Sequence, residues 1–212
     1  MKALKDNVRS VGMKKICKKL SEKHGIDISS LTALDFYARK GDWQTAVYAD
    51  VVRDIEAWEV DPEHEEQLIK NLPAHANIRI GNSFTIAREE RYKNKFDFIV
   101  LDNPAGCYGK GLYCEHFESL ELVKKLMTRD FGVVVFNIKT NPFDFDKFPE
   151  WKKRRQQYYG LEDTSNLSLE FIENFYRNKL EIIGKRVKFL FIEHRPQQND
   201  LYAVVVGLEE KD

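Results

Sequence analysis

Short apolar runs alternate with segments of helical periodicity through the middle of this chain, and no other feature constrains the fold as strongly. The apolar runs that have the length of buried strands are residues 32–38, 55–60, 77–80, 96–102 and 131–138. The segments between them repeat apolar residues every three or four positions, as one face of a helix does. Strands that alternate with helices pair in parallel through right-handed crossovers, so the sequence predicts a doubly wound α/β sheet.

The two ends of the chain add different elements. Residues 1–30 are predicted to form a helical cover, because Met13, Ile16, Cys17 and Leu20 recur at helical spacing before Gly25. Residues 141–166 read as an irregular insertion, and the apolar runs 185–195 and 201–208 flank a turn-rich link, as antiparallel strands do. We therefore expect one domain over residues 1–212, with a mostly parallel seven-stranded sheet that ends in an antiparallel hairpin.

Composition excludes few functions, but it indicates the environment and the partners of the chain. Lys plus Arg and Asp plus Glu both number 34, so any contact with a polyanion must come from a local patch. Three Cys form an odd set without metal spacing, which favours a reducing, cytoplasmic environment. No apolar run approaches the ~20 residues of a membrane span, and the start of the chain lacks the apolar core of a signal peptide. We expect no membrane and no metal among the partners.

Polar residues follow the predicted strands at the edge where open α/β sheets bind ligands. Asp102, Asn103 and Pro104 end the fourth strand, and Glu59 ends the second, about 20 residues after the turn that follows the first. An acid there can accept hydrogen bonds from both ribose hydroxyls, and the lack of an adjacent Arg argues against a 2′-phosphate and NADP. Asp61, which directly precedes Pro62, is better explained as a helix cap.

This order of strands and strand ends resembles the class I S-adenosylmethionine-dependent methyltransferases, over roughly residues 32–208. The segment ALDFYARKGDW is similar to their first motif, with Asp35 and Gly41 present but Arg39 and Asp42 where glycines are usual. The resemblance implies S-adenosylmethionine as cofactor, with Asp35 near the methionine amino group, Glu59 at the ribose, and Asn82, assisted by Ser83, at the adenine. Tyr37, Ala38, Val60 and Asp102 would also contact it.

The segment LDNPAG resembles the Asp/Asn/Ser-Pro-Pro-aromatic motif of methyltransferases that modify exocyclic amino groups. The resemblance implies that the Asn103 side-chain oxygen and the Pro104 carbonyl accept the two N–H bonds of the target nitrogen, beside Asp102. Ala105 and Gly106 replace the second Pro and the aromatic, so Tyr108 would supply the stacking face. The expected reaction is direct methyl transfer to an amino nitrogen of a DNA or RNA base.

The segment WKKRRQQYYG in the insertion interleaves cations and aromatics, a composition suited to phosphate contacts and base stacking. Its candidates for substrate binding are Lys152, Lys153, Arg154, Arg155 and Tyr158, although a charge run of this length also suits a solvated surface.

Other chemistries remain open alternatives at this point. Cys107 is a candidate nucleophile, but a thiolate needs a positive neighbour that the sequence does not show. Cys114 and His116 lie close together without further ligands at zinc spacing. The chain could instead be a nucleotide-dependent oxidoreductase, or a non-catalytic module that kept the methyltransferase fold.

Overall fold

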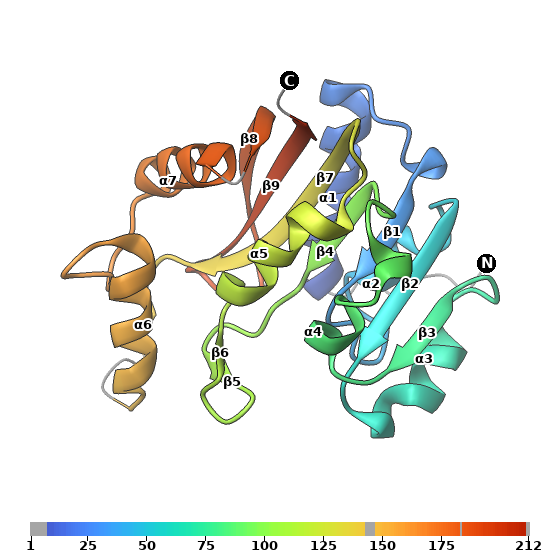
Figure 1. Ribbon diagram of the computed structural model, residues 1–212, viewed down its shortest axis with the longest axis horizontal. Helices are drawn as coiled ribbons and strands as arrows, with labels where there is room; N and C mark the ends of the chain where they lie inside the picture. The colour runs from blue at the N-terminus through green and yellow to red at the C-terminus, as the bar shows by residue number, and fades with distance from the viewer. Residues whose placement is uncertain (1–7, 143–146, 183, 211–212) are drawn as a thin grey trace.

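The computed structural model describes residues 8–142, 147–182 and 184–210, and its centre is a seven-stranded sheet (Figure 1). The sheet has the strand order β3-β2-β1-β4-β7-β9-β8. Its strands are β1 (Thr32–Asp35), β2 (Asp54–Glu59), β3 (Asn77–Ile80), β4 (Phe98–Leu101), β7 (Phe131–Lys139), β8 (Lys185–His194) and β9 (Leu201–Glu210). The pairs among the first five are parallel, whereas β9 runs antiparallel to both β7 and β8. The predicted sheet and its C-terminal antiparallel hairpin are confirmed.

Helices cover both faces of this sheet. They are α1 (Val8–His24), α2 (Thr45–Tyr48), α3 (Glu65–Asn71), α4 (Ser83–Ile86), α5 (Phe117–Leu126), α6 (Pro149–Tyr159) and α7 (Leu169–Ile182), with 3-10 turns η1 (Ile28–Ser30), η2 (Pro62–His64) and η3 (Glu90–Tyr92). A small hairpin of β5 (Cys107–Tyr108) and β6 (Tyr113–Cys114) extends from the lower edge in Figure 1. None of the helices within the described residues is both long enough and apolar enough to cross a membrane.

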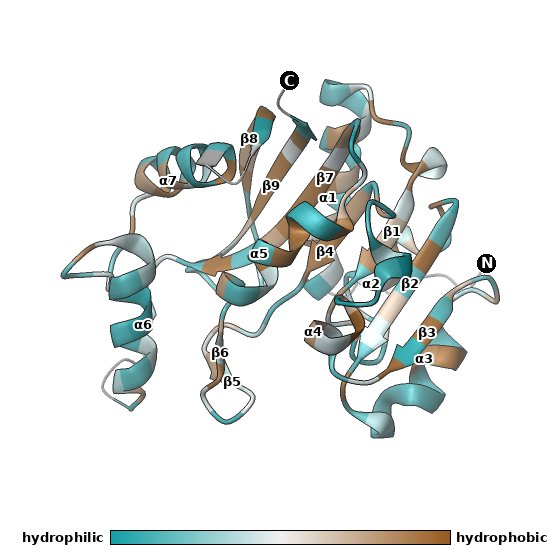
Figure 2. Ribbon diagram, in the orientation of Figure 1, coloured by the Kyte–Doolittle hydropathy of each residue, from teal (hydrophilic) through white to brown (hydrophobic). Residues whose placement is uncertain are grey.

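The alternation of side chains along the strands divides the interior into two apolar layers. In β4, Ile99 and Leu101 belong to the layer under α5 and α7, while Phe98 and Val100 belong to the layer under α1. Strands buried on both faces read as continuous apolar runs, and Figure 2 shows β4 and β7 largely brown between helices with teal outer faces. Within the predicted cover of residues 1–30, helix α1 buries Met13, Ile16 and Leu20, and residues 1–7 lie outside the described residues.

Two local predictions were wrong. Residues 149–159 of the predicted irregular insertion form α6, which has Pro149 in its first turn and the left-handed Gly160 after its last; residues 143–146 lie outside the described residues. The spacing of Trp43, Ala46, Val47 and Val51 predicts one apolar helical face after β1, but the helix there is only four residues long and Val51 is 52% exposed. The buried side chains there are Thr45 and Tyr48, because their hydroxyls bond an interior carboxylate.

Candidate active site

A cavity of about 680 Å³ opens at the carboxyl edge of the sheet, over the ends of β1, β2 and β4. This is the point where the strand order reverses and where open α/β sheets bind ligands. Segments from the β5–β6 hairpin and the link between β8 and β9 complete its wall. The predicted cofactor residues that line it are Tyr37, Ala38, Glu59, Val60, Asn82, Ser83 and Asp102.

Glu59 ends β2 and presents its carboxylate to this cavity. Two backbone amides hold it: Arg39 N–H donates to Oε2 at 2.7 Å, and Asp61 N–H donates to Oε1 at 2.8 Å. Each carboxylate oxygen has two lone pairs, so each retains one acceptor site. A side chain that is only 6% exposed and held in this way is already oriented for a ligand with two neighbouring hydroxyls.

Two other residues of the predicted cofactor set do not line the cavity. The Asp35 carboxylate is buried beneath it and accepts from the Thr45 hydroxyl at 2.6 Å and the Tyr48 hydroxyl at 2.7 Å. Burial raises the pKa of Asp35 to about 6. Gly41 has φ +66°, and a Cβ there would press on Leu72, so its glycine serves a tight turn that packs on α3.

Asn82 caps α4, whereas a role at the adenine amino group would need its amide oxygen as a free acceptor. Its amide oxygen accepts from Phe84 N–H at 2.9 Å and from Thr85 N–H at 3.4 Å, so the group left for a ligand is its NH₂, which is a donor. The neighbouring Ser83 hydroxyl donates to the Phe36 carbonyl at 2.8 Å. Phe84 stacks on Tyr113 with ring centroids 4.0 Å apart, which adds a flat apolar wall at this end of the cavity.

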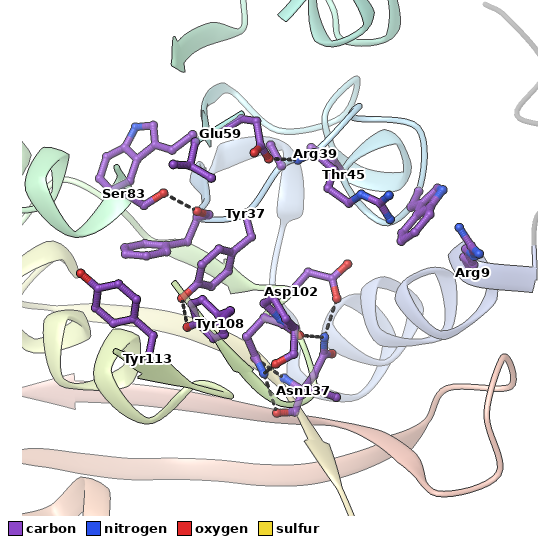
Figure 3. Close-up of a pocket in the computed structure, with 18 of the residues that line it drawn as sticks. Arg9, Tyr37, Arg39, Thr45, Glu59, Ser83, Asp102, Tyr108, Tyr113 and Asn137 are labelled. Atoms are coloured by element: carbon purple, nitrogen blue, oxygen red, sulfur yellow. Dashed lines mark hydrogen bonds between the residues drawn. The ribbon is translucent and has the colours of Figure 1, made fainter. Parts of the chain in front are cut away.

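At the end of β4, four side chains form a connected polar network, of which Asp102 and Asn137 are labelled in Figure 3. Arg195 Nη1 donates to Asp102 Oδ1 at 2.7 Å and also to Asn137 Oδ1. The Asn137 side-chain NH₂ donates to the same Asp102 oxygen at 2.5 Å. With the Gln197 amide oriented by its hydrogen bonds, its oxygen accepts from Arg195 Nε at 2.9 Å and Nη2 at 2.8 Å. The guanidinium is therefore held on several sides and fixes the Asp102 carboxylate at the cavity wall.

This network changes the predicted role of Asn103. Its side-chain oxygen accepts from Asn137 N–H at 3.0 Å, its NH₂ faces the Asn137 carbonyl at 3.3 Å, and the residue is only 3% exposed. Asn103 lines the cavity, and these two bonds tie its side chain to β7. Asp102 and the exposed Pro104 also line the cavity at this end of β4, and both carry acceptor oxygens.

Tyr108, predicted as the stacking residue, lies on the β5–β6 hairpin and lines the cavity. Its hydroxyl donates to the Glu115 carbonyl at 2.8 Å and lies 2.7 Å from the Tyr37 hydroxyl. Burial raises the pKa of Tyr37 to about 12 and also raises that of Tyr108, so both phenols remain neutral. The two rings meet edge to face, which fixes the hairpin against the turn after β1.

The basic segment of α6 divides into two groups, and none of its predicted substrate residues lines the cavity. Lys152 and Lys153 are exposed, while Arg154 is half-buried in an ion pair with Glu118. Arg155 is fully buried: it pairs with Glu115 at 2.5 Å and donates to the Lys139 carbonyl at 3.0 Å. A guanidinium with those partners cannot reach a substrate, so its predicted role is wrong.

Tyr158 is also part of the interior, because its ring stacks on Phe117 with centroids 3.8 Å apart. The structure likewise disfavours the nucleophile and zinc alternatives. Burial raises the pKa of the Cys107 thiol, which keeps it protonated. Both ring nitrogens of His116 contact protein groups, because Nδ1 lies 3.0 Å from the Asn137 carbonyl oxygen and Nε2 lies at the Tyr176 hydroxyl. Among the residues that the structure describes, no three His, Cys, Asp or Glu side chains gather as metal ligands.

Asn137, Arg195 and Arg9 line the cavity but were not among the predicted site residues. Asn137 lies inside an apolar strand, where its polar side chain was the one available signal. Arg195 lies in the link between two strands and reaches a carboxylate 93 positions away in the sequence. Pattern reading along the chain has no access to that contact.

Searches by sequence found no matching family model and no matching curated protein. Solved structures do match the fold. M. jannaschii TYW2 in complex with AdoMet shares 13% identity at a TM-score of 0.56, covering 97% of this chain and 80% of that one. The Burkholderia thailandensis 1,6-didemethyltoxoflavin-N1-methyltransferase, with S-adenosylhomocysteine bound, shares 12% identity at a TM-score of 0.57, covering 96% of this chain and 80% of that one. A Pyrococcus horikoshii protein described as a putative RNA methyltransferase shares 15% identity at a TM-score of 0.54, covering 94% of this chain and 83% of that one. The chain therefore has the Rossmann-like methyltransferase fold.

Proposed function

We propose that this protein is an S-adenosylmethionine-dependent methyltransferase. The observation that carries the proposal is the Glu59 carboxylate, held by two backbone amides at the rim of a cavity at the switch point of the sheet. The residues of the cavity suit this cofactor, because paired acceptors for ribose hydroxyls lie in the same cavity as the apolar Val60 and the stacked Phe84 and Tyr113. Two of the structural neighbours hold AdoMet or S-adenosylhomocysteine, which supports the same ligand here.

The acceptor is proposed to be an amino nitrogen. The bound donor would supply an electrophilic sulfonium methyl, and the protein's task is to hold the nucleophile in line with it. Asp102 and the Pro104 carbonyl can accept the two N–H bonds of an amine, which aims its lone pair away from them. The same acceptors favour the positive charge that develops on nitrogen during transfer. Arg195 and Asn137 keep the Asp102 carboxylate in position.

A nucleic acid base is the acceptor class that we favour. A planar base needs a stacking surface, and the aromatic group of Tyr37, Tyr108 and Tyr113 lines the same cavity as Asp102. The exposed Lys152 and Lys153 of α6 are the cations of the insertion that remain available for phosphates. One of the neighbours described as acting on RNA supports this class, whereas another is named for a small heterocyclic substrate.

A non-catalytic module is the second candidate, and one observation favours it. Asn103, the residue most similar to a catalytic motif, lines the cavity but is 3% exposed, and its side-chain oxygen accepts from the backbone of β7. A chain that had lost catalysis would keep the fold and could keep the cofactor.

Calorimetric titration tests the proposal directly. S-adenosylhomocysteine should bind to the intact protein, whereas NAD should not; binding of NAD alone would indicate an oxidoreductase. Glu59→Gln should weaken binding about tenfold or more, because it removes the charge and sets an NH₂ against one of two N–H donors. Glu63→Gln is the matched control, since Glu63 is exposed and lies outside the cavity. Circular dichroism should show both variants folded.

Transfer of a tritiated methyl group from the donor to RNA, DNA or cell extract then separates enzyme from module. Asp102→Asn should abolish transfer while donor affinity stays within a few fold. Donor binding without transfer to any of these acceptors would favour the module, and equal affinities of Glu59→Gln and the unmodified protein would refute the site.

A further inference from the structure

One corner of the cavity holds cations stacked on an aromatic ring. The guanidinium carbons of Arg9, from α1, and Arg39, from the turn after β1, lie 3.7 Å and 4.2 Å from the centroid of the Trp43 ring. All three side chains line the cavity, and both arginines are exposed. Stacking on Trp43 fixes the plane of a guanidinium group, which prepares it to bind an anion through parallel hydrogen bonds.

The backbone at Arg39 is unusual as well. Its φ is +49°, a left-handed conformation that costs a residue with a side chain on the order of 1 kcal/mol and that glycine adopts freely. Methyltransferases that the turn resembles have glycine here, so glycine would relieve this cost. Strained side chains of this kind concentrate at ligand sites. The Arg39 N–H also holds Glu59 Oε2 at 2.7 Å, so the cation sits beside the ribose acid.

Charge at this corner has both signs. Asp42 is exposed and lines the cavity next to Trp43, and in the close-up Ser83, Glu59, Arg39 and Arg9 follow one another from left to right across the cavity (Figure 3). A ligand whose ribose binds Glu59 therefore has the apolar Phe84 end on one side and the Arg39 corner on the other. Two guanidiniums with one carboxylate complement a zwitterion, whereas a run of phosphates would be repelled by Asp42 and Glu59.

We propose that Arg39, stacked on Trp43 together with Arg9, binds the α-carboxylate of the methyl donor, and that Asp42 binds its α-ammonium group. This assignment rests on the proposed function. Asp42 takes the place of Asp35 as the partner of the amino group, because the Asp35 carboxylate already accepts hydrogen bonds from Thr45 and Tyr48. In this chain a charged side chain thus does what the backbone of a glycine-rich turn does in the proteins it resembles.

Three nucleoside ligands test the assignment by calorimetry: S-adenosylhomocysteine, its decarboxylated analogue, and 5′-methylthioadenosine, which lacks both charged groups. The unmodified protein should bind S-adenosylhomocysteine about tenfold or more tightly than the decarboxylated analogue. Arg39→Gly, which relieves the strained backbone and so should fold, should reduce that preference toward unity without weakening methylthioadenosine. Asp42→Asn should weaken both ligands that carry the ammonium. Lys40→Ala is the matched control, because Lys40 is a cation of the same turn that does not line the cavity.

The outcomes separate the two proposals. If none of the three ligands binds, the proposed function fails. If all bind and Arg39→Gly keeps the full preference for the carboxylate, this inference is overturned while the function stands. A loss of oligonucleotide affinity in Arg39→Gly, with the carboxylate preference intact, would assign the corner to substrate phosphates and also overturn it. If Lys40→Ala lost the carboxylate preference as fully as Arg39→Gly does, the preference would come from the net positive charge of the turn and the inference would be overturned.

Discussion

Replacing Asp35 with Asn should change how the stability of this protein depends on pH. The carboxylate lies at the end of β1, 1% exposed, beneath the turn that carries Tyr37 to Arg39 into the cavity. Its oxygens accept from Thr45, Tyr48 and the Tyr37 N–H. These bonds favour the ionised form, but burial and the neighbouring Asp102 oppose it, and the pKa is raised from 3.8 to about 6.

The sign follows from proton binding. Between pH 3.8 and about 6 the folded protein holds a proton on Asp35 that the unfolded chain has released, so stability from this group falls as pH rises through that window. A folded-state pKa of about 6 against 3.8 in the unfolded chain corresponds to about 3 kcal/mol of unfolding free energy, at about 1.4 kcal/mol per pH unit. Once the pH is well above the folded-state pKa, the loss is complete. The free energy of unfolding of the Asp35→Asn variant, minus that of the unmodified protein, should therefore increase by about 2–3 kcal/mol between pH 4 and pH 7.

Urea denaturation followed by circular dichroism at several pH values measures this difference. Asp50→Asn serves as the control, since Asp50 is exposed and its replacement should leave the pH dependence unchanged. Parallel stability curves for Asp35→Asn and the unmodified protein from pH 4 to pH 7 would refute the reasoning, because they would mean that Asp35 titrates alike in the folded and unfolded chain.

Other perturbations test the remaining contacts. Arg195→Met should cost about 2 kcal/mol of unfolding free energy and should lower methyl transfer far more than donor binding, because it leaves Asp102 without its cation; equal losses in both would argue against a positioning role. Arg155→Met should cost about 3–5 kcal/mol by leaving Glu115 buried and unpaired, and a second change, Glu115→Gln, should recover part of this in urea denaturation. Gly207→Ala should cost about 1–3 kcal/mol, since a Cβ would collide with the Phe189 ring; an unchanged midpoint would show that the ring moves aside.

Much of the fold could be predicted because the signals are local. Period-two and period-3.6 patterns report which face of an element is buried, and Asn77–Ile80 was predicted with its observed bounds. Helix α6 was missed because its helical face buries a cation, Arg155, between Trp151 and Tyr159. A periodic pattern that includes a charged residue does not read as apolar until the buried partner, here Glu115, is known.

The sequence by itself determined the order of strands and helices, and with it the edge at which Glu59 and Asp102 meet. That information is carried by neighbouring residues, because strand ends and helix starts are encoded within a few positions. Only the tertiary structure decided how the polar side chains at that edge are used: Asn82 turns its oxygen to cap α4, Asn103 turns inward to β7, and Arg195 arrives from the far end of the chain. These choices depend on which hydrogen-bond partners the folded chain brings within reach, and those partners lie in remote segments.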